Sequence, residues 1–159
     1  MKTDTLSEKA LIGALLQAHD RAFPVCQQAG ITLASFTDEV CISAWGAVEL
    51  LRSRKPGIID PLTVAETMDG DAGENLSALG QMVDECPTAE HAAFYAAQVR
   101  TAERRRGLHS AARMAVEALA RGDALDEVAA SLLAAGEAVE GGDHGQVIVE
   151  SIADFLNDP

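Results

Sequence analysis

The chain has 159 residues, which is enough for one domain, or for one domain followed by a tail. Apolar residues make up 48% of it and aromatic residues only 4%, which favours a core of Ala, Leu and Val on helices over an aromatic-rich β-sheet. The formal net charge of -13 excludes general binding to nucleic-acid phosphates unless the few cations cluster.

Cysteine usage and hydropathy exclude further classes of protein. Cys26, Cys41 and Cys86 lie far apart and form no Cys-x-x-Cys pair, so neither a zinc site nor a disulfide framework is indicated. The polar N-terminus lacks the apolar run of a signal peptide, and no stretch approaches the ~20 apolar residues of a membrane span. We therefore expect a protein of the reducing cytoplasm.

Residues 1–87 predict a compact head of short helices. Thr5 and Glu8 have the spacing of a capping box, and an apolar face at helical spacing follows them, formed by Leu11, Ile12, Leu15 and Leu16. A second short helix is expected from Pro24 to Gly30, and residues 31–36 are expected to be a connection.

A third helix is expected to open at Thr37, with Asp38 and Glu39 in its first turn, and to end at Pro56-Gly57. Its expected buried face consists of Cys41, Ala44, Trp45, Val48 and Leu51.

Two more helices complete the predicted head. Asp60-Pro61 is a cap followed by proline at the first helical position, and it predicts a short helix over residues 62–68. A polar loop over residues 69–73 precedes a further helix over residues 75–85, whose expected inward residues are Leu76, Leu79, Met82 and Val83.

A long antiparallel helical hairpin is predicted over residues 88–140. Thr88 after Pro87 is a start signal, and one helix face is then marked by Ala92, Tyr95, Val99 and Ala102. Gly122 suits the left-handed residue that ends a helix, and Asp123 is expected to cap the second helix. Residues 141–159 are expected to be a linker or tail, with a final helix or docking arm over 146–156.

The outer half of this hairpin carries an apolar stripe that it cannot bury alone. We expect the stripe to pair with another copy of the chain through Leu108, Ala112, Ala115, Leu119, Val128 and Leu132. The first arm is rich in arginine and the second in Asp and Glu, and this opposite charge favours antiparallel pairing within or between chains.

The sharpest charged feature is an arginine cluster on the first arm. Arg104, Arg105 and Arg106 are consecutive and Arg100 lies one turn earlier, so the three neighbours point in different directions. A solvated helix face explains them, and contact with an acidic surface of a partner or of a second copy is the functional alternative. Nucleic acid is a third alternative, which the overall charge opposes.

No catalytic, cofactor-binding or metal-binding pattern is present in the sequence. No glycine is followed by lysine, which excludes the phosphate-binding loop of ATPases, and no G-x-S-x-G elbow occurs. The four histidines are scattered, and Asp69-Gly70-Asp71 lacks the later ligands of a calcium loop. We therefore expect no enzyme activity and no cofactor.

Several segments in order resemble the N-terminal domain of the DnaB-type hexameric replicative helicases. The first is Glu8–Leu16, similar to that family's opening acidic-then-apolar helix, and the second is Ile59–Thr67. The third and fourth are Leu79–His91 and Ala93–Arg100, and the resemblance covers roughly residues 5–139. It departs at residues 40–51, where the family's usual helix start is missing, and at Gly107.

The resemblance implies a helical head followed by a hairpin that pairs between subunits, in a collar that also receives primase or loader proteins. The first hypothesis is thus a non-catalytic oligomerisation and docking domain of a DnaB-like helicase, active in DNA replication within the primosome. The alternative is a stand-alone adaptor or inhibitor that binds a helicase or primase, for example from a mobile element. No direct contact with nucleic acid or membrane is expected.

Overall fold

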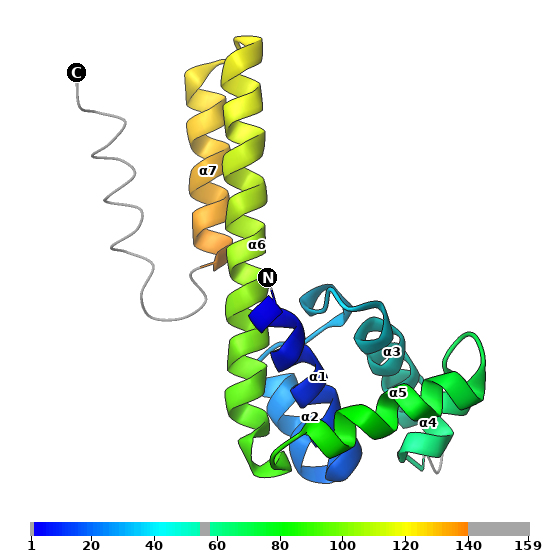
Figure 1. Cartoon of the computed structure of the whole chain (residues 1–159). Coiled ribbons are helices and arrows are strands. Elements are labelled where there is room, and N and C mark those ends of the chain that lie inside the picture. Colours follow the sequence, from blue (N-terminus) through cyan, green and yellow to red (C-terminus); the bar gives the residue numbers. More distant parts are fainter. Residues whose placement is uncertain (1, 55–57, 140–159) are drawn as a thin grey trace. The chain divides into compact units, whose positions relative to one another are not determined.

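The computed structural model describes residues 2–54 and 58–139. The expectations for Pro56-Gly57 and for residues 140–159 lie outside this range. Within it the chain forms seven α-helices and no strand, which confirms the all-α fold (Figure 1). The helices are α1 (Lys2–Gln17), α2 (His19–Gln28), α3 (Glu39–Ser53), α4 (Pro61–Thr67), α5 (Ala72–Glu85), α6 (Ala92–Arg121) and α7 (Leu125–Val139). Two short 3-10 helices are η1 (Leu33–Ser35) and η2 (Ala89–His91).

The chain divides into two compact units, Met1–Glu103 and Arg104–Pro159. The first unit therefore includes the first turns of α6 as well as the residues before Pro87. The four α6 residues expected to share a face, Ala92, Tyr95, Val99 and Ala102, are all buried, and Ala96 is buried as well.

Helix α1 holds the ends of two other helices in the first unit. The Glu8 carboxylate is buried and accepts hydrogen bonds from the backbone N–H groups of Thr37 and Asp38, both at 2.9 Å, and from the Thr37 hydroxyl at 2.8 Å. At the other end of α1, Gln17 Nε2 donates to the carbonyl oxygen of Val83 at 2.9 Å. The predicted capping box is wrong, because Thr5 lies inside α1 and Glu8 binds the start of α3 instead.

Helices α1 and α5 approach each other closely at Gly13. A Cβ atom at this position would lie 2.2 Å from the carbonyl oxygen of Met82 and 2.7 Å from Cβ of Cys86. Real Cβ atoms do not approach backbone oxygens this closely, so only glycine fits here without moving a helix.

Helix α2 begins at His19, five residues before the predicted start at Pro24. Ala18, with φ -152°, separates it from α1. Pro24 lies inside the helix, where its missing N–H removes the bond to the carbonyl of Asp20. The end of the helix is as expected, since Gly30 has a positive φ of 70°.

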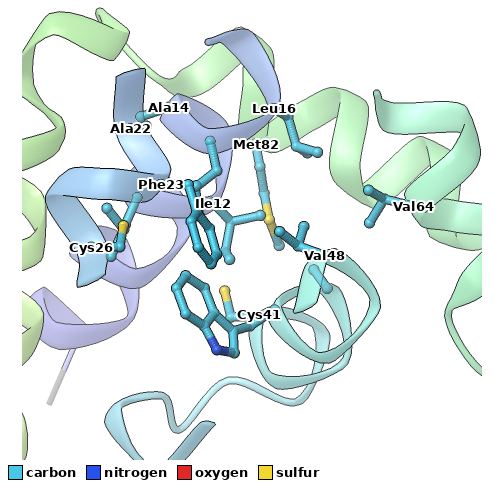
Figure 2. Packing of buried hydrophobic residues seen from close by; sticks show 14 of the residues in the cluster. Ile12, Ala14, Leu16, Ala22, Phe23, Cys26, Cys41, Val48, Val64 and Met82 are labelled. Carbon is cyan, nitrogen blue, oxygen red and sulfur yellow. The ribbon is translucent and has the colours of Figure 1, made fainter. Parts of the chain in front are cut away.

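Aromatic side chains pack together in the core of the first unit. The ring of Trp45 lies 5.6 Å from the rings of both Phe23 and Phe36, and the guanidinium of Arg52 lies 3.9 Å from the Phe23 ring centre. Figure 2 shows Phe23 together with Ile12, Cys41, Val48 and Met82 in one cluster drawn from four helices. The expected face of α3 is buried except for Leu51, which is half-buried.

Aspartate side chains cap the starts of α3 and α4. Asp60 accepts from the N–H of Thr63, which confirms the predicted cap of α4. Asp38 accepts from the N–H groups of Val40 and Cys41, so the cap of α3 is Asp38 rather than Thr37.

A third aspartate starts α5 earlier than the sequence predicted. Asp71 accepts from the N–H of Glu74, so this helix begins at Ala72 rather than at residue 75. Two of the residues expected to face inward on α5, Leu79 and Met82, are buried. Val83 is half-buried, and Leu76 is exposed.

In the second unit, α6 runs without a break through Gly107 to Arg121. Gly122 has a φ of 85°, and its N–H bonds to the carbonyl of Leu119 while the N–H of Asp123 bonds to that of Ala118. This pair of bonds is a Schellman motif, and it confirms the predicted end of the helix. Helix α7 begins at Leu125, so Asp123 does not cap it and its carboxylate accepts from Arg121 instead.

Candidate functional site

The apolar residues of the second unit are the strongest candidate for a functional surface. The six residues predicted to mediate self-association fall into three classes in the structure. Ala115 and Val128 are buried, Leu108 and Leu132 are half-buried, and Ala112 and Leu119 are exposed. The two buried residues are covered within the chain, so they are not free to meet a second copy.

Other large apolar side chains of this unit are exposed and were missed by the sequence analysis. The exposed fraction is 66% for Val116 and 48% for Leu133, compared with 44% for the predicted residue Leu119. Val116 lies one turn after Ala112 on α6, and Leu133 lies two turns after Leu125 on α7. A helical-wheel count would have found both residues, because i, i+4 neighbours share a face.

Each helix of the unit thus carries an apolar stripe beside a buried residue. On α6 the stripe is Ala112, Val116 and Leu119, and on α7 it is Leu125, Ala129 and Leu133. All of them are exposed except Ala129, which is half-buried. Each residue advances about 100° around the helix axis. Counted in the chain direction, the stripe residues lie about 40–140° around the axis from the buried residue, which is Ala115 on α6 and Val128 on α7. We call these two stripes together the apolar face.

The opposite flank of each helix is more polar. Ser110 and Arg121 lie there on α6, and Glu127 and Ser131 lie there on α7, all of them exposed. Met114 is a large apolar residue on this flank of α6, and it is 63% exposed. Each helix therefore has an apolar flank and a more polar one, which is typical of helices that associate through a single face.

Of the four arginines predicted to contact a partner, Arg100 is engaged inside the first unit. Its guanidinium is half-buried and pairs with Glu103, which also accepts a hydrogen bond of 2.7 Å from the Ser35 hydroxyl. The same guanidinium lies beside Gly30, where an added Cβ would be 3.9 Å from it. Arg100 therefore lies between Gly30 and Glu103 in the first unit, and its contact with a partner stays a prediction.

The three consecutive arginines belong to the second unit. Arg104 and Arg106 are half-buried, and Arg105 is exposed. Arg104 Nε is buried and has no hydrogen-bond partner among the residues that the structure describes. Further along α6, Arg113 pairs with Glu117 at 3.7 Å and Arg121 with Asp123 at 2.9 Å.

The first unit has an apolar groove between the start of α1 and the junction of α5 with α6. It has a volume of 270 Å³ and is lined by residues that include Leu6, Ala10, Met82, Phe94 and Tyr95. Leu6 and Phe94 are exposed at its edge.

The buried groups of the first unit are poor reactants. Burial raises the pKa of the Cys26 thiol to about 12 and also raises that of Cys41 well above its ordinary range. A thiol that stays protonated at neutral pH is a weak nucleophile. Among residues 2–54 and 58–139, no group of three or more His, Cys, Asp or Glu side chains is placed to hold a metal ion. None of the helices described is both long and apolar enough to cross a bilayer.

Comparison with known proteins places the first unit in a family. Residues 1–101 match the family described as DnaB-like helicase N terminal domain. No curated protein matches the chain. The matched residues include nearly all of the first unit and end before the arginine cluster of the second.

Proposed function

Because the chain belongs to the DnaB-like helicase N-terminal domain family, we propose that it is a non-catalytic self-association and protein-docking module of a DnaB-like replicative helicase. Its place is then DNA replication in the cytoplasm, as part of a helicase collar. The family membership supports a helicase-related domain, and the apolar face of the second unit supports the self-association. That apolar face is the observation that carries the proposal.

The proposed arrangement of the second unit pairs α6 and α7 in antiparallel directions, with Ala115 beside Val128. Both residues are buried although little else in this unit is, which supports their mutual contact. The Schellman motif at Gly122 supports a reversal of the chain. With this pairing, Leu119 lies close to the level of Leu125.

Antiparallel pairing also places both stripes on one side. On each helix the stripe is rotated from the buried residue in the same sense, when the helix is viewed along its own chain direction. Because the two helices run in opposite directions and face each other through the buried residues, this rotation brings both stripes to the same side of the helix pair. The stripes then form a continuous apolar face two helices wide, suited to a second pair of helices in a four-helix arrangement.

A second copy of the chain is the occupant that we propose for this face. Burying apolar surface contributes roughly 25 cal/mol per Å², so covering a two-helix face of leucine, valine and alanine favours dimerisation. A self-complementary face also suits a dimer with two-fold symmetry, in which the same patch is used on both copies.

Charge substitutions on the apolar face test the proposal. Val116→Glu and Leu133→Glu change exposed side chains, so we expect the helix content to stay unchanged while the dimer dissociates to monomer. The expected rise is at least about tenfold in the dimer dissociation constant for each variant, measured by sedimentation velocity over a range of concentrations.

Met114→Glu is the matched control, because Met114 is as exposed as Val116 but lies on the other flank of α6. It should leave the sedimentation behaviour unchanged. A wild-type chain that stays monomeric at high concentration would remove self-association and favour the stand-alone adaptor. Leu119→Glu should act like Val116→Glu, since Leu119 belongs to the same stripe.

Docking of a primase or of a helicase loader is the second part of the proposal. Capture of either protein by the immobilised chain, retained in the Val116→Glu monomer, would place docking and self-association on different surfaces. Capture of neither would confine the function to self-association.

A further inference from the structure

The apolar groove of the first unit lies along the face of α1 that meets α5. Leu6, Ala10 and Gly13 recur every three or four residues, so they share that face. At Gly13 the face touches α5, because an added Cβ would meet the carbonyl oxygen of Met82. Toward the start of α1 the same face lines the groove, and Leu6 at its edge is exposed. The apolar face of α1 thus continues past the point where the fold covers it.

The groove has a buried floor and an exposed aromatic wall. Met82 and Tyr95 line it and are buried, whereas Phe94 lines it and is exposed. The Phe94 and Tyr95 rings meet edge to face, with 6.0 Å between their centres. A cavity of about 150 Å³ takes a benzene-sized molecule, so a groove of 270 Å³ has room for one large apolar side chain and part of another.

The charge at the edge of the groove is negative. Among the described residues, Lys9 and Glu85 are the charged ones that line it. The Lys9 ammonium lies 3.7 Å from the Asp38 carboxylate, which offsets its charge. The exposed Glu85 carboxylate accepts a hydrogen bond of 2.7 Å from the Gln81 amide, and within the described part of the chain it forms no ion pair. With a formal net charge of -13 as well, the chain favours a cationic segment here over another acidic copy of itself.

We propose that this groove binds a basic amphipathic helix of a partner protein. Leucine or aromatic side chains of that helix pack against Met82 and Tyr95, and a lysine or arginine approaches Glu85. Recognition of this kind places apolar side chains spaced three or four residues apart into a groove. The inference rests on the docking part of the proposed function and deepens it, because it names the docking surface and the chemistry of the partner.

A synthetic peptide tests the groove in the full chain. The probe has about 18 residues, enough to form a helix, with leucine along one face and lysine along the other. It should bind and shift the amide resonances of groove residues such as Ala10, Glu85 and Tyr95. A peptide of the same composition with the leucines scattered around the helix should bind at least about tenfold more weakly, as should one with glutamate in place of lysine. Equal binding of the three peptides would overturn the proposal.

Acidic substitutions at the edge of the groove should weaken the binding. Leu6→Asp and Phe94→Asp change exposed side chains, so we expect unchanged circular dichroism and a rise of at least about tenfold in the dissociation constant of the peptide. Ile58→Asp is the matched control, because Ile58 is 63% exposed, against 64% for Leu6 and 61% for Phe94, and does not line the groove. An equal loss in Ile58→Asp, or no loss in Phe94→Asp, would contradict the placement of the peptide.

Glu85→Gln tests the charge, since the amide keeps the size of the side chain. The dissociation constant of the leucine–lysine peptide should rise about threefold in low salt, and the difference should disappear in high salt. Glu66→Gln, at an exposed position on α4, should leave the binding unchanged. A Glu85→Gln chain that binds as tightly as the wild type in low salt would overturn the choice of a basic partner.

Sedimentation and capture separate this inference from the proposed function. The Val116→Glu monomer should bind the peptide as the wild type does, because its change lies in the second unit. If Phe94→Asp instead dissociates the dimer, a second copy occupies the groove and the proposal is wrong. Capture of a primase or loader that is equal in the wild type and in Phe94→Asp would keep docking and remove the groove as its surface. Peptide binding at the groove without capture of either protein would keep the groove and remove those two partners.

Discussion

The two compact units bury their apolar side chains to different extents. In the first unit Leu11, Ile12, Leu15 and Trp45 are almost fully buried, around helices held at their ends by side chains of α1. In the second unit only Ala115 and Val128 are buried among the residues described, while Val116, Leu125 and Leu133 are exposed. The first unit thus has a core of its own, whereas the second has an exposed apolar surface.

This contrast predicts that stability resides in the first unit and that the proposed association resides in the second. A change that disturbs packing in the first unit should destabilise its fold, because the backbones of α1 and α5 are in close contact at Gly13. A change of similar size in the second unit should alter association and leave the first unit folded. The difference between the two units is tested most directly by making the same substitution in each of them.

Glycine to alanine is that substitution, and it should give the largest effect. Gly13→Ala places a Cβ against the carbonyl oxygen of Met82, so α1 and α5 must separate. We expect a loss of about 3 kcal/mol in the free energy of unfolding, measured by urea denaturation followed by circular dichroism.

Gly107→Ala is the matched change in the second unit. Nothing lies within 4 Å of a Cβ added at Gly107, and α6 is continuous there. The substitution should raise helix stability by about 0.5–1 kcal/mol, since alanine is the better helix former. Equal effects of the two substitutions would contradict the contrast between the units.

The second effect in size concerns the link from α1 to α3. Glu8→Ala removes a buried carboxylate that accepts two backbone N–H groups and one hydroxyl, and it leaves those donors without this acceptor. We expect a loss of about 2 kcal/mol in the free energy of unfolding of the first unit. Thermal unfolding measures it, with Glu66→Ala as the exposed control at under ~0.5 kcal/mol.

Glu8→Gln sharpens this test, because the amide keeps one oxygen acceptor and nearly the same volume. It should recover part of the loss. A Glu8→Ala variant as stable as the wild type would show that the start of α3 does not depend on α1.

Local signals in the sequence predicted much of the fold. Asp60 caps the helix that follows it, Gly122 has a positive φ, and the spacing of Ala92, Tyr95 and Val99 marks a buried face. In each case the physical cause lies within a few residues of the signal. A carboxyl before a helix, a glycine after it and a period of 3.6 are all read from neighbours in the chain.

Features that depend on distant contacts were not predictable in this way. Glu8 has the spacing of a local cap, but its donors lie 29 and 30 residues away. Pro24 is a residue typical of a helix start, yet α2 begins earlier because Ala18 interrupts the preceding helix. The stripe around Ala115 was found, but its division into buried and exposed residues depends on which side another helix covers.

The smallest of the expected losses of stability occurs in alkali and belongs to the first unit. Burial raises the pKa of the Cys26 thiol from 9.0 to about 12, so above pH 9 the unfolded chain loses a proton that the folded chain keeps. The stabilisation is complete below pH 9 and is lost as the pH rises toward 12. Near pH 10 the expected loss is about 1 kcal/mol for this thiol.

Chemical denaturation at pH 8 and pH 10 measures this loss, and Cys26→Ala should reduce it. All three cysteines precede Glu103, so the second unit contributes no thiol to the effect. The Val116→Glu monomer should therefore show the same alkaline loss as the wild type, since its change lies in the other unit. If the alkaline loss were absent from the monomeric variant, the titrating groups would lie on the apolar face. That result would contradict the division of roles between the units.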